Sequence, residues 1–271
     1  AHLDGFQTQA FASIHEVDDN EQGHYKALHD ALAGRGIADV RMGIQNIVLK
    51  ELYAALSSLA SPDFFREIEA KQAKKFVSGL EKPALAFFET VTRFIEGDYG
   101  AQDLPSMKSR RAKPNAPKQG AIAKNAWKRY SRALRSFLTL CARADRQTGA
   151  ASRSPTSPLG EFASILERRP SLRTSIPAAL ILHSFRELCG GDNASDTARD
   201  LVALWSVDQK LCELAMEYGV GSREVAHDLA IFADSLILAT KKAPSAKKLV
   251  PAMISRIFSD ARLSSRLGIH E

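Results

Sequence analysis

The chain has 271 residues, of which 45% are hydrophobic and 25% charged, so it has the composition of a globular protein and is not disordered throughout. Cys141, Cys189 and Cys212 form no CxxC pair, which argues against a disulfide framework or zinc knuckle and predicts reduced core thiols. The sequence shows neither a signal peptide nor an apolar run near the about 20 residues that cross a bilayer, so we expect a cytoplasmic protein.

The net charge of +6 is unevenly distributed along the chain. No acidic residue occurs between Asp103 and Asp145, whereas eleven basic residues do. They are Lys108, Arg110, Arg111, Lys113, Lys118, Lys124, Lys128, Arg129, Arg132, Arg135 and Arg143. The rest of the chain holds 26 basic and 31 acidic residues, so an acidic body carries one cationic segment.

The N-terminal part, residues 1–98, has the apolar spacing of helices. From Ile37 to Leu59, apolar residues recur every three or four positions, which predicts one buried helix face. Ser61–Pro62–Asp63 ends that helix and begins another, which carries its apolar residues as far as Val77. Pro83 opens a further helix that Gly97 closes.

The middle of the chain divides into three segments. Residues 99–120 contain Pro105, Pro114, Pro117 and Gly120 among basic residues and are predicted to form a basic flexible loop. Residues 121–146 are predicted to form a cationic amphipathic helix, and residues 147–160, rich in serine and proline, a linker.

The C-terminal part, residues 161–271, is again helical in pattern. A short helix around Leu180–Leu188 is expected to end at Gly190, and Ser222 is a plausible N-cap for a helix with apolar residues on both sides. We expect the helix that follows Ser222 to be central and buried. Because no β-type alternation is visible, the predicted fold class is all-α, a multi-helix bundle or irregular array of about ten helices without significant sheet, in one domain or in separately folding parts.

The cationic helix is the main candidate for function. Its basic residues Lys124, Lys128, Arg132 and Arg135 fall about 140° around the helix from its apolar residues. The apolar residues are Trp127, Tyr130, Leu134, Phe137, Leu138 and Cys141. The predicted anion-binding residues are these four bases together with Lys108, Arg110, Arg111 and Lys113 of the loop. The alternative interpretation is that this basic segment is a solvated surface with no partner.

The expected partners of this segment are nucleic acid or an acidic protein, although no RRM-type aromatic run and no zinc-finger spacing is present. A membrane surface is a weaker hypothesis, because the apolar side of the helix is more simply explained as core. The oligomeric state cannot be inferred from the sequence.

Metal ligation is a second hypothesis that we considered. Glu-x-x-His occurs as Glu21–His24 and as Glu224–His227, the spacing that di-iron four-helix bundles use. Only Glu51 and Glu89 are candidates to complete such a set, and His227 is more simply explained as a hydrogen-bonded core histidine. We therefore assign no metal ligand and no cofactor.

No GxSxG elbow, GxGxxG loop or P-loop lysine is present. The sequence thus assigns no catalytic residue and leaves enzymatic activity uncertain. A non-enzymatic helical binding or scaffolding module with a cationic surface is the preferred interpretation.

Three stretches carry a resemblance to a known family: Ile44–Leu52, Trp127–Leu138 and the closing Arg266–Glu271. They resemble helical segments that accompany the catalytic barrels of α-amylase-family glycoside hydrolases. The barrel and its carboxylates are absent, so the resemblance implies no active-site residue here. It implies the alternative function of a non-catalytic helical region within a larger carbohydrate-active enzyme.

Overall fold

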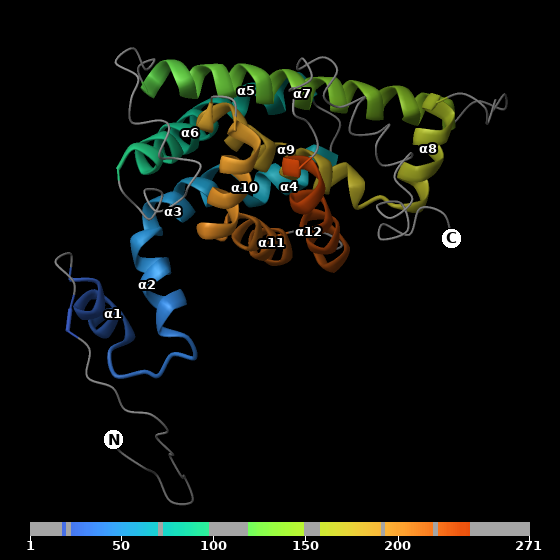
Figure 1. Ribbon diagram of the computed structural model, residues 1–271. Helices are drawn as coiled ribbons and strands as arrows, with labels where there is room; N and C mark the ends of the chain where they lie inside the picture. Colours follow the sequence, from blue (N-terminus) through green and yellow to red (C-terminus); the bar gives the residue numbers. More distant parts are fainter. Residues whose placement is uncertain are drawn as a thin grey trace, which may run out of the picture. The chain divides into compact units, whose positions relative to one another are not determined.

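The computed structural model describes residues 18–19, 23–69, 73–97, 119–148, 158–190, 193–218 and 222–238. Within these ranges every regular element is an α-helix and no strand occurs, which confirms the predicted all-α class (Figure 1). The predicted basic loop, apart from its last two residues, most of the predicted linker and the C-terminal residues 239–271 lie outside the described residues. The chain divides into two compact units, residues 1–49 and 50–271.

The described part of the first unit is a helical hairpin of α1 (His24–Leu32) and α2 (Val40–Val48). First-turn backbone amides of each helix donate to an aspartate carboxylate. In α1 the acceptor is Asp19, which precedes the helix, at 2.9 and 3.1 Å, and in α2 it is the N-cap Asp39, at 2.8 and 3.2 Å. These carboxylates satisfy amides that a helix N-terminus leaves without intrahelical partners. Gly43 is buried in this hairpin.

The predicted single buried face from Ile37 to Leu59 is wrong in its first half. The helix is divided at Leu49 into α2 and α3 (Lys50–Leu59). Leu52, Leu56 and Leu59 of α3 are fully buried, whereas Ile37 is 38% and Val40 46% exposed. The apolar spacing of the sequence continues across Leu49, where the two helices are divided. However, α2 belongs to the smaller unit, in which only a few apolar side chains are buried.

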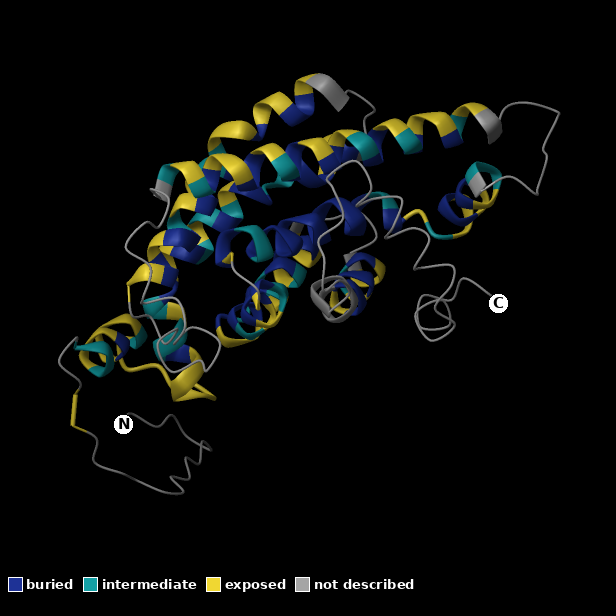
Figure 2. Ribbon diagram, turned by 45° about the horizontal axis from the view of Figure 1, so that its top comes forward, coloured by how far each residue is buried: buried dark blue, intermediate teal, exposed yellow. Residues whose placement is uncertain are grey.

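The second unit is organised around α9 (Leu172–Cys189). All of its residues except Arg173, Arg186 and Glu187 are buried, as expected of a helix that is apolar around most of its circumference (Figure 2). Four long helices pack against it. They are α6 (Glu81–Glu96), α7 (Gln119–Thr148), α10 (Ala194–Leu204) and α12 (Ser222–Leu238).

The remaining helices cover the outer sides of these four. Helix α3 packs against α6, α5 (Ala73–Gly79) and α8 (Pro158–Arg168) against α7, and α11 (Val207–Tyr218) against α12. Helix α4 (Pro62–Glu69) also contacts α9. Long-range packing between the described helices therefore holds this unit together.

The structure changes two expectations about the C-terminal helices. Helix α9 is longer than the predicted short helix and includes Pro177, because tertiary burial outweighs the loss of one intrahelical hydrogen bond there. Helix α12, which was expected to be central and buried, is exposed along one side at Arg223, Glu224 and His227. The interpretation of His227 as a core histidine is therefore wrong.

Aromatic rings connect the helices in the interior of the second unit. Phe94 of α6 meets Trp205 edge-on, with ring centroids 6.0 Å apart, and Phe185 of α9 approaches the same indole at 6.4 Å. Phe88 of α6 meets Tyr130 of α7 in a similar edge-on contact at 6.1 Å. Such pairs contribute about 0.5–1.5 kcal/mol beyond area burial, so they help to fix how α6, α7 and α9 pack.

A buried ion pair fixes the turn between α8 and α9 to α12. The Asp228 side chain is fully buried, and its two oxygens lie 2.7 Å from Arg169 Nη2 and 2.7 Å from Ser171 Oγ. A buried carboxylate is tolerated when both of its oxygens are hydrogen-bonded in this way.

Replacing Asp228 by alanine should lower the free energy of unfolding by about 3 kcal/mol, because Arg169 and Ser171 lose their shared acceptor. Urea unfolding followed by circular dichroism measures the change. The exposed Glu224→Ala substitution on the same helix is the control and should stay within about 0.5 kcal/mol of the parent. Equal stabilities of the two variants would contradict a role for the buried pair.

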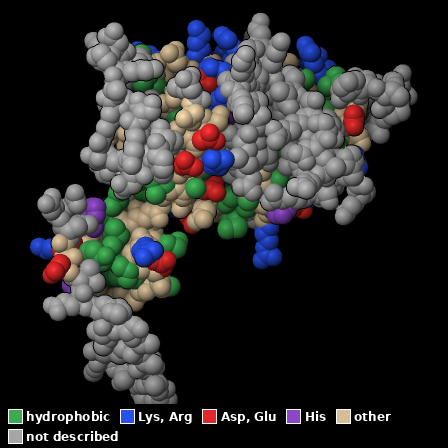
Figure 3. Space-filling view, in the orientation of Figure 1, with side chains coloured by type: hydrophobic (Ala, Val, Ile, Leu, Met, Phe, Trp, Pro, Cys, Tyr) green, Lys and Arg blue, Asp and Glu red, His purple; other side chains and the backbone are tan. Residues whose placement is uncertain are grey.

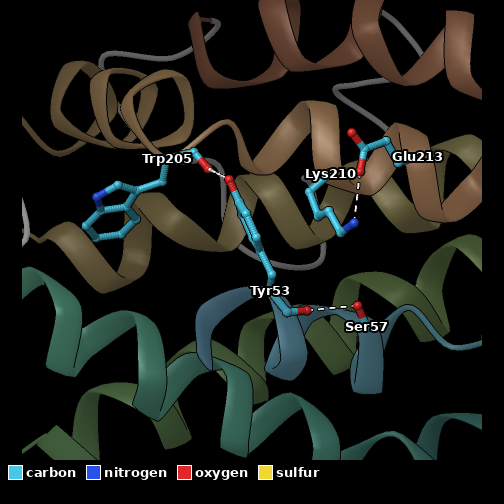
Figure 4. Close-up of polar contacts among 5 residues, drawn as sticks. All are labelled: Tyr53, Ser57, Trp205, Lys210 and Glu213. Atoms are coloured by element: carbon cyan, nitrogen blue, oxygen red, sulfur yellow. Dashed lines mark hydrogen bonds and ion pairs between the residues drawn. The ribbon is translucent and has the colours of Figure 1, made fainter. Parts of the chain in front are cut away.

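Tyr53 connects α3 to the turn between α10 and α11, as Figure 4 shows. Its hydroxyl donates to the Trp205 carbonyl at 2.9 Å, just before Ser206, which has a positive φ of 45°. Lys210 Nζ lies 5.9 Å from the centre of the Tyr53 ring and 2.8 Å from the Glu213 carboxylate. The phenol therefore stabilises a turn whose backbone is locally strained.

Tyr53→Phe should lower the free energy of unfolding by about 1 kcal/mol, the typical net contribution of one hydrogen bond. Ser57→Ala on the same helix is the matched control, since its hydroxyl donates to the Tyr53 carbonyl within α3. Chemical denaturation of the three proteins would compare them. A phenylalanine variant as stable as the parent would show that the hydroxyl adds nothing to the turn.

Candidate anion-binding face

Helix α7 is amphipathic, and its apolar face is packed into the second unit. The six apolar residues predicted to face inward are all at most 9% exposed. They are Trp127, Tyr130, Leu134, Phe137, Leu138 and Cys141. Because this face contacts α5, α6, α8 and α9, the rotation of α7 about its own axis is fixed and the opposite face must be exposed to solvent.

The exposed face of α7 is cationic along most of its length. Lys124, Lys128, Arg132 and Arg135 are all exposed, as their spacing predicted. Arg143 and Arg146 are exposed on the same side. Figure 3 shows basic side chains projecting at the edge of the molecule where Figure 1 places α7. We refer to these six residues as the cationic stripe.

Sequence reasoning did not assign Arg143 and Arg146 to this face, although the signal was present. They lie eight and eleven residues after Arg135, which places them about 80° and about 20° around the helix from it at 100° per residue. Both residues lie within the predicted helix 121–146, and α7 extends two residues further, to Thr148. At 1.5 Å per residue the stripe is about 33 Å long, and at 100° per residue it covers about 100° of the helix surface.

Within the part of the chain that the structure describes, none of the six stripe residues forms an ion pair. In contrast, basic residues closer to the core are paired: Arg129 Nη1 lies 2.7 Å from Glu187 Oε2, and Arg173 Nη2 lies 2.5 Å from Asp145 Oδ1. Of the other exposed positions on α7, none described is acidic or a large apolar residue; they are Ala121, Asn125, Thr139 and Ala142. The stripe thus presents uncompensated positive charge.

A buried histidine, His183 of α9, lies near Arg129 and Arg186 where α7 packs against α9. His183 is 8% exposed. Burial, together with the nearby guanidinium groups of Arg186 and Arg129, lowers its pKa to about 4. His183 is therefore neutral at pH 7 and adds no charge to this side of the molecule.

Because the His183 imidazole titrates near pH 6.5 when unfolded and near 4 when folded, its contribution to stability is complete above pH 6.5 and is lost as the pH falls toward 4. Urea unfolding at several pH values in this range measures the loss. His183→Gln should flatten this part of the stability profile. A His183→Gln profile that parallels the profile of the parent would refute the assignment.

The loop residues predicted to extend the anion-binding site cannot be placed by the structure. Lys108, Arg110, Arg111 and Lys113 lie outside the described residues. Their participation stays a prediction, which rests on their position 6–11 residues before the start of α7 in the sequence.

The groups considered for a di-iron set have other positions and partners. Glu51 is exposed and its carboxylate pairs with Arg93, and Glu89 lies on the exposed side of α6. Glu21 is outside the described residues. Across the described ranges, no group of three or more His, Cys, Asp or Glu side chains is placed to hold a metal ion.

No disulfide joins the three cysteines, and two of them are core residues as predicted. Cys141 and Cys189 are buried, whereas Cys212 is half-buried, with its Sγ 3.4 Å from the Ala226 carbonyl. Burial raises the pKa of Cys141 to about 12 and that of Cys212 to about 11. Neither thiol therefore has the thiolate character of a reactive cysteine.

Among the helices described, none combines the length and the apolar character needed to cross a membrane.

No family model, curated protein or solved structure matches this chain. The resemblance to helical segments of α-amylase-family proteins therefore stays a prediction. Its first stretch, Ile44–Leu52, spans the break between α2 and α3, and its second, Trp127–Leu138, is the middle of α7. The third, Arg266–Glu271, lies outside the described residues.

Proposed function

We propose that this chain is a helical binding module that holds an anionic partner against the cationic stripe of α7. The observation that carries the proposal is that six exposed basic side chains share one helix face without an acidic neighbour on that face. Lys124, Lys128 and Arg132 follow one another at i, i+4, where like charges destabilise a helix by a few tenths of a kcal/mol per pair. A bound polyanion would remove this repulsion.

The packing of α7 supports an electrostatic mode of binding. A basic amphipathic helix binds membranes by inserting its apolar face, but the apolar face of α7 is occupied by α6 and α9. What the helix offers a partner is a row of charges at fixed positions. Each exposed contact contributes little alone, so affinity depends on several being made together, and it falls as salt rises.

Fluorescence anisotropy at low salt, with labelled heparin, polyglutamate and nucleic acid as probes, tests this proposal. We expect binding of at least one of these polyanions that weakens by tenfold or more when Lys124, Lys128, Arg132 and Arg135 are changed to glutamine. The weakening is expected because four counterion-releasing contacts are lost. Glutamine keeps helix propensity, so circular dichroism should show unchanged helicity.

The matched control removes two lysines and two arginines elsewhere on the second unit. These are the exposed Lys50, Arg66, Lys82 and Arg223. Because the net charge changes equally, a specific role for the stripe predicts that the control loses much less affinity than the stripe variant. Equal losses in both variants, or no binding of any polyanion at about 50 mM salt, would overturn the proposal.

A further inference from the structure

We infer that the partner of the cationic stripe is the phosphate backbone of a nucleic-acid duplex, bound without reading its base sequence. This inference rests on the proposed function, and it identifies the chemical class of the partner. Three features of α7 distinguish a duplex from an acidic protein and from a single strand.

The first feature is the absence of an apolar anchor on the exposed face of α7. Protein interfaces depend on buried aromatic or large apolar side chains, surrounded by polar residues. The large hydrophobic residues that are exposed in the described part of the chain all lie on other elements. They are Ile37, Val40, Met42, Leu204 and Met216. Phosphate contacts need only cations and small polar groups, and this is what the stripe offers.

The second feature is that the aromatic residues of α7 face the core. Trp127 is 8% and Tyr130 2% exposed, and their rings pack against each other, while Tyr130 also packs against Phe88. Proteins that bind single strands without sequence preference use exposed aromatic rings on which the bases stack. Since the stripe has no such ring, a single strand would gain only electrostatic contacts.

The third feature is the regular placement of the charges on a rigid element. The stripe is about 33 Å long, which matches one duplex turn of about 34 Å. A duplex also presents about one phosphate per 1.7 Å of its axis, twice the linear charge density of one strand. The cations of a packed helix therefore lie in a stronger negative potential along a duplex than along a single strand.

The packing of α7 also determines that bases are not read. A recognition helix enters the major groove, which is about 12 Å wide, with its side chains on the base edges. Helix α7 packs against α5, α6, α8 and α9, and we expect these neighbours to hold it across the phosphate backbone and out of the groove. Its cations are limited to the phosphates, so affinity should not depend on base sequence.

The test is anisotropy of the full chain with labelled 20-base-pair duplex DNA of two base compositions, duplex RNA, and an unstructured single strand of equal length. We expect at least one duplex to bind about tenfold more tightly than the single strand, and the two DNA compositions to differ by less than about twofold. The slope of log K against log salt should become shallower by about 3 to 4 in the stripe variant, since each phosphate contact contributes about 0.9.

The other outcomes refute the duplex inference, the binding through the backbone alone, or the proposed function itself. A single strand that binds as tightly as the duplexes, or affinity for polyglutamate alone, refutes the duplex inference and leaves the proposed polyanion-binding function intact. A strong preference for one DNA composition refutes binding through the backbone alone. Failure to bind any polyanion, with parent helicity confirmed by circular dichroism, refutes both the inference and the function on which it rests. The two duplex probes show whether DNA or RNA is preferred.

Discussion

The enclosure of α9 by other helices is the constraint on which the second unit depends. A helix buried on nearly all sides must be apolar around most of its circumference, and each helix that covers it must turn an apolar face inward. For α7 this requirement fixes the rotation of the helix about its axis. Since Trp127, Tyr130 and Phe137 are in the core, Lys128, Arg132 and Arg135 are necessarily exposed to solvent.

The protein neutralises charge where it is buried and leaves it unpaired on one face. Asp228 has no exposed surface and is held by Arg169 and Ser171, and Arg129 is paired with Glu187 where α7 meets α9. Burying an ion without a partner would cost several kcal/mol, so the pairing of the buried Asp228 stabilises the fold. No such requirement acts on the exposed face of α7, where pairing with acidic residues is absent among the described residues.

Rigidity and charge together give the stripe its proposed role. A flexible basic segment would lose conformational entropy on binding a polyanion, whereas side chains on a packed helix already have fixed backbone positions. The same packing buries the aromatic rings on which the bases of a single strand could stack. What remains favours a regular and densely charged partner.

The sequence by itself determined the all-α class, the amphipathic character of α7 and the exposure of Lys124, Lys128, Arg132 and Arg135, because helix periodicity is a local property of neighbouring residues. It did not determine the break at Leu49, the full length of α9 or the exposed position of His227. Only the tertiary structure decided these, and also that Asp228 pairs with Arg169, 59 residues away in the sequence. Each depends on which helices meet in space, and apolar spacing along one helix shows that a face is buried without showing what covers it.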